Sequence, residues 1–248
     1  MSGGPSRRIE RVQLAARNNA VWCDTVCRAH GRPGEFFDSI WINRHETPPF
    51  YPNAVTLSGD SGTEHLSRIR DLNAAGISGE WAVKDSFLEM DLAPLGFRVL
   101  FEAHWIYRPV SPPPAPVADA PWTRVGSPAD LADWEAAWRG ESAPGPAQCV
   151  FPPSLLRDPA ITFVVAHRRG RIVAGAITNV TANAVGLSNM FGPSDEIEQF
   201  RVGCLAHLIE MCPRLPVVGY ESGEDLLGSL ALGFEAVGPL RVWGRASD

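Results

Sequence analysis

Apolar residues recur along the first half of the chain with spacings that distinguish helices from strands. From Ile9 to His30 they fall roughly three or four residues apart, which predicts an amphipathic helix that Gly31 ends. Ser61 and Glu64 have the spacing of a capping box at the start of a second helix. The other elements expected here are strands at 36–43, 54–57 and 80–84, a helix at 64–75, a short helix up to 95 and a long strand up to 107.

The second half shows the same alternation more clearly. Two alternating apolar runs, 161–167 and 171–177, flank a turn at Gly170 and predict a β-hairpin. Ser127 is placed to cap a helix that extends through Trp138. The remaining predicted elements are strands at 122–125, 184–191, 215–220 and up to 243, a helical turn at 154–157, and helices at 196–211 and 224–232.

One pattern occurs twice in the chain. Leu-Gly-Phe stands at 95–97 and again at 232–234, each time after an apolar strand that ends near an acid and a short helical stretch. Each copy opens a long strand that ends near a tryptophan, and we expect Trp105 and Trp243 to pack at equivalent places. The repeat predicts two related units rather than one large domain. The expected boundaries are 1–108 for a reduced first unit, 109–120 for a proline-rich linker and 121–248 for the second unit.

Composition and charge narrow the classes of protein to consider. With 45% hydrophobic residues and a formal net charge of −6, the chain can bury a core and offers no broad basic surface for nucleic acid. It has no signal-like amino terminus and no run of about 18 apolar residues, so we expect a cytoplasmic protein that does not insert into membranes. Five cysteines fit a reducing compartment. Cys23, Cys27 and His30 share a helical face without a second ligand pair, and we expect no metal.

The order of these elements, with Leu-Gly-Phe opening the final strand, resembles the GNAT superfamily of acyl-CoA-dependent N-acyltransferases. The resemblance covers about 121–245 well and covers about 54–108 in the first half. Its strongest single match is Ser-Leu-Ala-Leu-Gly-Phe at 229–234, where a glycine ends a helix before a buried strand. The fold class that it implies is α+β, with tandem GNAT-like units and a mixed, mostly antiparallel central sheet flanked by helices. Whether the halves share one sheet is left open.

In that family two neighbouring strands splay apart, and acyl-CoA inserts between them with its pyrophosphate at the amino end of the next helix. The resemblance places these strands at 184–191 and 215–220, so the backbone at 189–191 is expected to hold the thioester and the pantetheine arm of acetyl-CoA. The residues expected to bind this cofactor are Asn189, Met190, Phe191, Arg201, Gly203 and Cys204. For Cys204, packing inside the helix is the alternative.

The expected phosphate loop departs from the family pattern. Gly203 aligns with one of its small residues, but Phe200 stands at the basic position. The loop also carries Asp195, Glu196 and Glu198, which would repel phosphate or, alternatively, stabilise the helix amino terminus. A second glycine-bearing loop, 58–63, occupies the matching place in the first half, where an anion site and a plain surface turn are both open.

The catalytic residues are taken from the same alignment. Many GNAT enzymes use a tyrosine acid four residues before the Leu-Gly-Phe glycine, and here Ser229 stands at that position. Glu221, beside Tyr220 at the end of a strand, is the candidate for deprotonating or orienting an amine, and Asp85 is its counterpart in the first unit. A solvated carboxylate at the entry of a helix is the other interpretation of Glu221.

Two hypotheses about function follow from this resemblance. The first is transfer of an acetyl or other acyl group from acyl-CoA to an amine of a small molecule. The second is a catalytically inactive GNAT-like protein that binds a ligand or a partner, favoured by the acidic loop and the missing tyrosine. Binding of acetyl-CoA distinguishes them in part, because an inactive relative that binds another molecule has no need of it.

Overall fold

The computed structural model describes residues 4–77, 79–115, 120–140 and 149–245. The helices and strands follow the expected order with shifts of a few residues at their ends, with one correction: the single strand expected at 36–43 is instead two short strands that pair antiparallel with each other, because the chain turns back between them. The first half contains α1 (Pro5–Ala29), β1 (Glu35–Phe36), β2 (Ile40–Ile42), β3 (Ala54–Thr56), α2 (Gly62–Ala74), β4 (Trp81–Asp85), a 3₁₀ turn (Ala93–Leu95) and β5 (Arg98–Arg108). The second half contains β6 (Trp122–Arg124), α3 (Pro128–Arg139), a 3₁₀ turn (Pro153–Arg157), β7 (Ile161–Arg168), β8 (Arg171–Val180), β9 (Val185–Phe191), α4 (Ile197–Met211), β10 (Val217–Glu221), α5 (Gly223–Ala231) and β11 (Glu235–Arg245).

These strands form one sheet across both halves. Its order is β1-β2-β3-β4-β11-β5-β10-β9-β8-β7-β6, and within the described residues the neighbours are antiparallel except in the pairs β3–β4 and β9–β10. The α+β class with a mixed, mostly antiparallel sheet flanked by helices is therefore confirmed.

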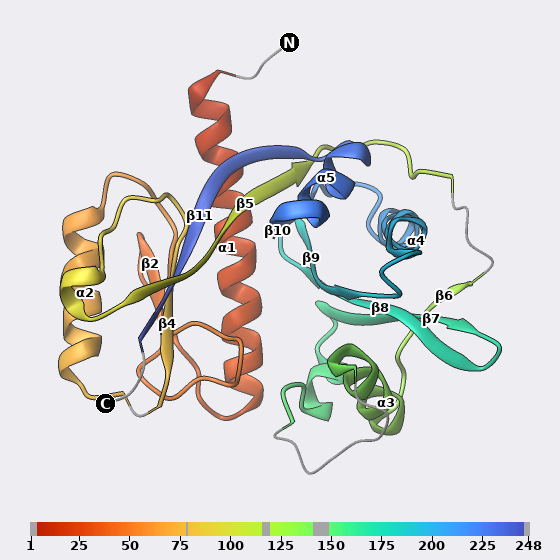
Figure 1. Ribbon diagram of the computed structural model, residues 1–248, viewed down its shortest axis with the longest axis horizontal. Helices are drawn as coiled ribbons and strands as arrows, with labels where there is room; N and C mark the ends of the chain where they lie inside the picture. Colours follow the sequence, from red (N-terminus) through yellow and green to blue (C-terminus); the bar gives the residue numbers. More distant parts are fainter. Residues whose placement is uncertain (1–3, 78, 116–119, 141–148, 246–248) are drawn as a thin grey trace.

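The two halves are joined because they exchange their last strands. β11, from the end of the chain, lies between β4 and β5 of the first half, and β5 lies between β11 and β10. Figure 1 shows β5 and β11 crossing the middle of the molecule side by side. Residues 116–119 of the expected linker lie outside the described residues.

The two Leu-Gly-Phe turns have the same local geometry. Gly96 and Gly233 both have φ 85°, a left-handed conformation that glycine adopts without steric cost. A Cβ built on Gly96 would lie 3.7 Å from Nε of Arg245, and one built on Gly233 would lie 3.7 Å from Nε of Arg108. Arg108 also donates a hydrogen bond of 2.9 Å from Nε to the carbonyl oxygen of Leu232. Each turn is thus packed against the arginine that ends the other half's long strand.

Helix α1 covers one face of the centre of the sheet. Its residues Val12 and Ala16 share a buried cluster with Trp105 of β5, Val218 of β10 and Leu240 of β11. It is 25 residues long, but neither it nor any other described helix has the length and apolarity needed to cross a membrane. Helix α1 therefore braces the strands that come from both halves.

Helix α2 covers the opposite face of the first half. Because side chains alternate along a strand, Trp81 and Val83 of β4 join the cluster under Ile69 of α2, whereas Ala82 packs with the α1 cluster. Lys84, two residues after Ala82, points to the α1 side as well and approaches Tyr220 of β10.

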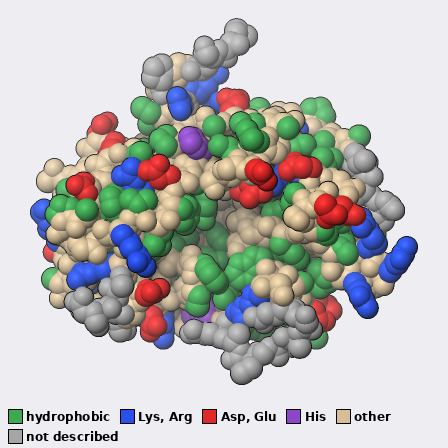
Figure 2. Space-filling model, viewed as in Figure 1, with side chains coloured by type: hydrophobic (Ala, Val, Ile, Leu, Met, Phe, Trp, Pro, Cys, Tyr) green, Lys and Arg blue, Asp and Glu red, His purple; other side chains and the backbone are tan. Residues whose placement is uncertain are grey.

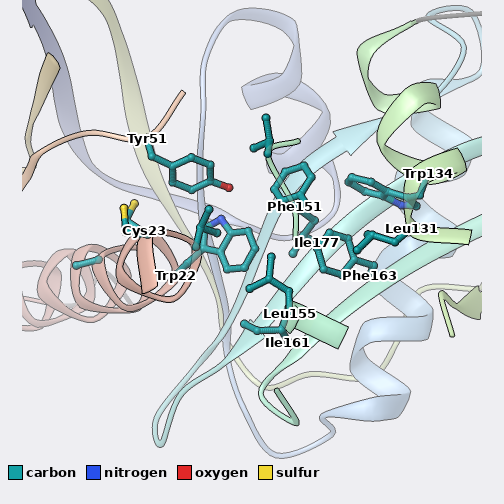
Figure 3. Close-up of a cluster of buried hydrophobic side chains, with 14 of the residues drawn as sticks. Trp22, Cys23, Tyr51, Leu131, Trp134, Phe151, Leu155, Ile161, Phe163 and Ile177 are labelled. Atoms are coloured by element: carbon teal, nitrogen blue, oxygen red, sulfur yellow. The ribbon is translucent and has the colours of Figure 1, made fainter. Parts of the chain in front are cut away.

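A second large core contains residues from both halves. Trp22 of α1 and Tyr51 lie against aromatic residues of the second half, and Figure 3 shows them facing Phe151. The rings of Trp22 and Phe151 are stacked with centroids 6.3 Å apart, and Trp134 of α3 meets Phe151 edge to face at 5.7 Å. This aromatic core ties α1 to the second half independently of the sheet.

Two local expectations are wrong. Ser61 makes no capping hydrogen bond, because Glu64 instead accepts one of 2.7 Å from the hydroxyl of Ser39 and pairs with Arg68. Trp105 and Trp243 do not pack at equivalent places. Trp105 lies nine residues after its glycine and Trp243 ten, and they belong to the clusters on opposite faces of the sheet.

Candidate functional site

Strands β9 and β10 separate after a short parallel contact. They pair only at Val217 with Val185 and at Val218 with Gly186 among the described residues, although both strands continue beyond these pairs. A bulge in the pairing of β8 with β9 turns β9 away, and Asn189 has φ 53° at this bend. The backbone of β9 beyond Gly186 is therefore unpaired on the side that faces β10.

A cavity of about 300 Å³ occupies this opening and is lined from both faces of the sheet. Helix α1 contributes Asn19 and Trp22 on one face. On the other face, Ile197 and Arg201 come from α4 and Asp225 comes from α5. A molecule placed in the cavity can therefore be reached from two directions, with the strand ends between them.

Glu221 lies at the end of β10, where its side chain is 26% exposed and lines this cavity. Burial raises the pKa of its carboxyl from 4.5 to about 7, while nearby Arg201 opposes the shift and Asp225 adds to it. Its Oε1 lies 3.7 Å from Nη1 of Arg201. A carboxyl with a pKa near neutrality can both accept and release a proton at physiological pH.

Arg201 is buried and surrounded by acids. Its Nη2 pairs with Asp225 at 2.7 Å, its Nε lies 3.7 Å from Oε1 of Glu198, and Nη1 faces Glu221. Nη1 also donates a hydrogen bond of 3.5 Å to the hydroxyl of Ser229. The guanidinium group thus holds α4, α5 and β10 together, and its charge is already balanced by carboxylates.

The amino end of α4 is acidic on its remaining sides. Glu196 forms an ion pair of 2.8 Å with Arg168 of β7, and Asp195 is exposed. Glu198 rests against Gly228 of α5, where a Cβ would overlap its carboxylate. The helix amino end offers backbone N–H groups but is surrounded by carboxylates, which is unfavourable for a second anion.

The counterpart residues in the first half have structural partners. Asp85 is buried and accepts hydrogen bonds from the backbone N–H groups of Phe87, Glu89 and Met90, the last at 2.9 Å. In the loop 58–63, the N–H of Asp60 donates to Glu89 at 3.4 Å. Asp85 therefore fixes a turn, and the amide of this loop already faces a carboxylate.

Two residues that sequence reasoning missed also line the cavity. Lys84 of β4 is 4% exposed, and its Nζ donates a hydrogen bond of 2.8 Å to Oδ1 of Asn19 and lies 4.1 Å from the ring centroid of Tyr220. The hydroxyl of Tyr51 is buried and has no hydrogen-bond acceptor among the described residues. A signal existed for the first of them, since Lys84 is the only lysine in the sequence and follows directly on an apolar run.

The candidate residues from the sequence fall into two groups. Those that line the cavity are Glu221, Tyr220, Asn189, Met190 and Arg201. Those that are not among its lining residues are Ser229, Phe191, Gly203 and Cys204. Ser229 is buried behind Arg201, Cys204 is fully buried, and Gly203 leaves room for Trp122, whose Nε1 would be 2.6 Å from an added Cβ.

The cysteines do not form a metal site in the described part of the chain. No group of three or more His, Cys, Asp or Glu side chains is arranged there to hold an ion. Burial raises the pKa of the Cys23 thiol to about 11 and that of Cys27 to about 12, and His30 faces the carbonyl oxygen of Val150 at 3.0 Å. These thiols remain protonated at neutral pH and pack in the aromatic core.

Comparison with solved structures identifies the architecture. A GCN5-related N-acetyltransferase from Kribbella flavida superposes with a TM-score of 0.64 at 15% identity, covering 95% of this chain and 96% of that one. The chain has the GNAT fold. A putative GNAT-family acetyltransferase from Novosphingobium aromaticivorans gives a TM-score of 0.56 at 14% identity, covering 92% of this chain and 97% of that one. The coverage means that the GNAT fold is shared over both halves.

A lower similarity extends to a longer protein. N-myristoyltransferase from Saccharomyces cerevisiae, solved with bound myristoyl-CoA, gives a TM-score of 0.52 at 9% identity and covers 77% of this chain and 58% of that one. No family model matches the sequence, and no curated protein matches it. The resemblance to the GNAT superfamily is therefore confirmed at the level of the fold.

Proposed function

We propose that the protein transfers an acyl group from an acyl-CoA thioester to an amine of a small molecule. The observation that carries this proposal is the cavity between the separated ends of β9 and β10, with Glu221 at its edge. The GNAT fold adds support, because two of the solved proteins with this fold are described as acetyltransferases and a third was solved with myristoyl-CoA.

The opening between β9 and β10 is better able to bind the pantetheine arm of an acyl-CoA than its phosphate groups. The unpaired backbone of β9 at 188–190 offers hydrogen-bonding groups to an amide-bearing chain, and the buried hydroxyl of Ser188 has no partner among the described residues. At the amino end of α4, the acids around Arg201 oppose the binding of pyrophosphate. We therefore place the acyl chain and the arm in the opening, and assign the phosphates no side-chain partner.

Glu221 performs the proton transfer in this scheme. The carboxylate accepts a proton from the ammonium group of the acceptor, and the free amine attacks the thioester carbonyl carbon. A C–N bond forms and the C–S bond breaks, the nitrogen gives up its second proton to solvent, the departing thiolate takes up a proton from solvent, and Glu221 releases the proton it accepted, so that one proton is liberated per turnover. The pKa of about 7 lets Glu221 be ionised in a large fraction of molecules at neutral pH.

A second candidate is a GNAT-like protein that binds a ligand or a partner without catalysis. The acidic surroundings of α4 favour it, because they weaken the attraction for a nucleotide. In addition, the family's tyrosine acid is replaced by Ser229, which is buried behind Arg201.

Calorimetric titration with acetyl-CoA, followed by turnover assays on a panel of amines, tests the proposal. We expect binding to the wild-type protein and to Glu221→Gln, and turnover that falls roughly 100-fold or more in Glu221→Gln. The exposed acid Glu224, three residues away in α5, gives the matched control Glu224→Gln, which should retain activity. Absence of binding at millimolar acetyl-CoA would exclude acetyl-CoA as donor, and binding without turnover on any amine would favour the second candidate.

A further inference from the structure

The only lysine of the chain is buried in the wall of a cavity, and among the described residues it has no counter-ion. The Lys84 side chain is 4% exposed, and no described carboxylate pairs with its ammonium group. Of its three N–H donors, the hydrogen bond to Asn19 uses one, and the ring of Tyr220 faces the charge at 4.1 Å. A buried ammonium ion is costly unless it is paired, so this position favours the arrival of an anion.

Tyr51 carries a second hydrogen-bond donor in the wall of the same cavity. Its hydroxyl points toward the indole of Trp22, which is itself only a donor, and the phenolic proton has no acceptor among the described residues. Tyr51 and Lys84 both line the cavity at the opening of the sheet. Both side chains therefore carry hydrogen-bond donors and no charged acceptor.

A larger, mainly apolar cavity adjoins this place. It measures about 550 Å³, shares Tyr51, Lys84 and Tyr220 with the first cavity, and is also lined by Ala82, Phe101 and Val242 among others. Figure 2 shows the surface hollowed near the middle of the view, with hydrophobic side chains around the hollow. An apolar group attached to a molecule held by Lys84 would find room and contact surface there.

We propose that Lys84 and Tyr51 bind a carboxylate of the acceptor, and that the acceptor is an amino acid-like molecule whose apolar side group enters the larger cavity. One ammonium and one phenolic donor match the single charge of a carboxylate better than a phosphate dianion, which favours guanidinium and several backbone N–H groups. The amine of such a molecule would lie in the smaller cavity, which Glu221 also lines. That this molecule accepts an acyl group rests on the proposed function, whereas the binding of its carboxylate by Lys84 and Tyr51 does not.

Binding measurements without acyl-CoA test the site directly. The full chain is titrated with L-phenylalanine, L-leucine and L-tryptophan, and with the three corresponding amides, which keep the amine and the apolar group but lack the carboxylate. We expect at least one acid to bind about tenfold or more tightly than its amide, as the loss of a hydrogen-bonded charged group requires. If every amide binds as well as its acid, or if none of the six binds, the carboxylate site is refuted.

Two variants test whether Lys84 and Tyr51 are responsible for the preference for acid over amide. Lys84→Met keeps an apolar stem and removes the charge, and Tyr51→Phe removes only the hydroxyl, so that it remains informative if the first variant fails to fold. Each should reduce the preference for acid over amide, whereas Arg171→Met, which removes an exposed charge in the β7–β8 turn, should not. An unchanged preference in folded Tyr51→Phe and Lys84→Met would overturn the assignment.

Turnover separates this inference from the proposed function. Selective binding of acids without any acyl transfer would refute the acyltransferase and leave the carboxylate site standing. Acyl transfer to amides as fast as to acids would support the acyltransferase and refute the carboxylate site.

Discussion

Glu221 links the candidate site to the stability of the protein through its titration. Because burial raises its pKa from 4.5 to about 7, the folded protein binds a proton that the unfolded chain has already released between these values. The contribution of this group to stability is therefore full below the lower pKa and is lost as the pH rises through the higher one. Above that window the ionised carboxylate lowers the free energy of unfolding by up to about 3 kcal/mol.

Glu221→Gln should remove this pH dependence. Relative to the wild type, we expect the variant to gain stability between about pH 5 and about pH 8, with a rise in Tm of several degrees at the upper end. Thermal unfolding of both proteins across this range measures the difference, and Glu224→Gln serves as the control. A difference in Tm that does not change with pH would show that the titration does not belong to Glu221.

Gly186 makes room for a buried polar network. A Cβ at this position would overlap the side-chain oxygens of Asn18 and Asn179, which bind each other through a hydrogen bond of 3.1 Å and connect α1 to β8. We expect Gly186→Ala to lower the free energy of unfolding by roughly 2 to 4 kcal/mol, from crowding and lost hydrogen bonds. Gly126→Ala, where nothing lies within 4 Å of the new Cβ, is the matched control, and denaturant unfolding measures both. Equal stability of the two variants would contradict the role of the network.

The sequence predicts those residues of the site that lie on strands aligned with the family through the Leu-Gly-Phe motif. Glu221 and Asn189 lie on strands placed by that motif, and both line the cavity. Lys84 and Tyr51 come from the first half, and their place at the site depends on β11 entering between β4 and β5. No local pattern encodes that pairing, because it joins strands more than 100 residues apart in the chain.

At the scale of elements, two serines at the N-cap positions of their helices differ in whether their side chains form a capping hydrogen bond. Ser127 accepts a hydrogen bond of 3.1 Å from the N–H of Asp130, which in turn accepts one from the N–H of Ser127, and so forms a capping box on α3. Ser222, at the start of α5, makes no side-chain capping bond. Ser127→Ala should lower the free energy of unfolding by about 0.5 to 2 kcal/mol, and Ser222→Ala should change it less. A larger loss in Ser222→Ala, measured by denaturant unfolding, would contradict this assignment.

The elements themselves were predictable where local chemistry decides them. The hairpin at Gly170 and the helix capped by Ser127 are both confirmed, because turn and cap signals lie within a few residues. The capping box at Ser61 is wrong because Glu64 binds Ser39, 25 residues earlier, which came near it only through folding. The expectation that Trp105 and Trp243 pack at equivalent places is wrong because one additional residue between glycine and tryptophan reverses the side on which a strand side chain points.

At the scale of the whole molecule, the exchanged strands and the shared aromatic core predict cooperative unfolding. The pairs β11–β5 and β10–β5 connect the halves through the sheet, and Trp22 and Phe151 connect them through the core. We expect a single transition in guanidinium chloride, with tryptophan fluorescence and far-ultraviolet circular dichroism changing together. Two separated transitions would show that the predicted units 1–108 and 121–248 unfold independently.

Separate expression of the two halves tests in a second way whether each half depends on the other for its folding. Fragment 1–120 lacks β11, which lies between β4 and β5 in the sheet. Fragment 121–248 lacks β5, which lies between β11 and β10. We expect them to copurify when expressed together and to aggregate when expressed alone, because long unpaired strand edges invite association. Two fragments that are separately monomeric and folded would argue against this dependence.

The position of β5 also affects how the chain folds during synthesis. This strand ends at Arg108, but its neighbours β10 and β11 begin only at Val217 and Glu235. At a translation rate of roughly 5 to 20 residues per second, the ribosome needs about 5 to 20 s more to deliver the first of them. During that interval β5 has no partner strand, and its exposed apolar residues Val99, Leu100 and Phe101 are available to chaperones and to other nascent chains. The first half of the protein therefore completes its sheet only when the last strand has left the ribosome.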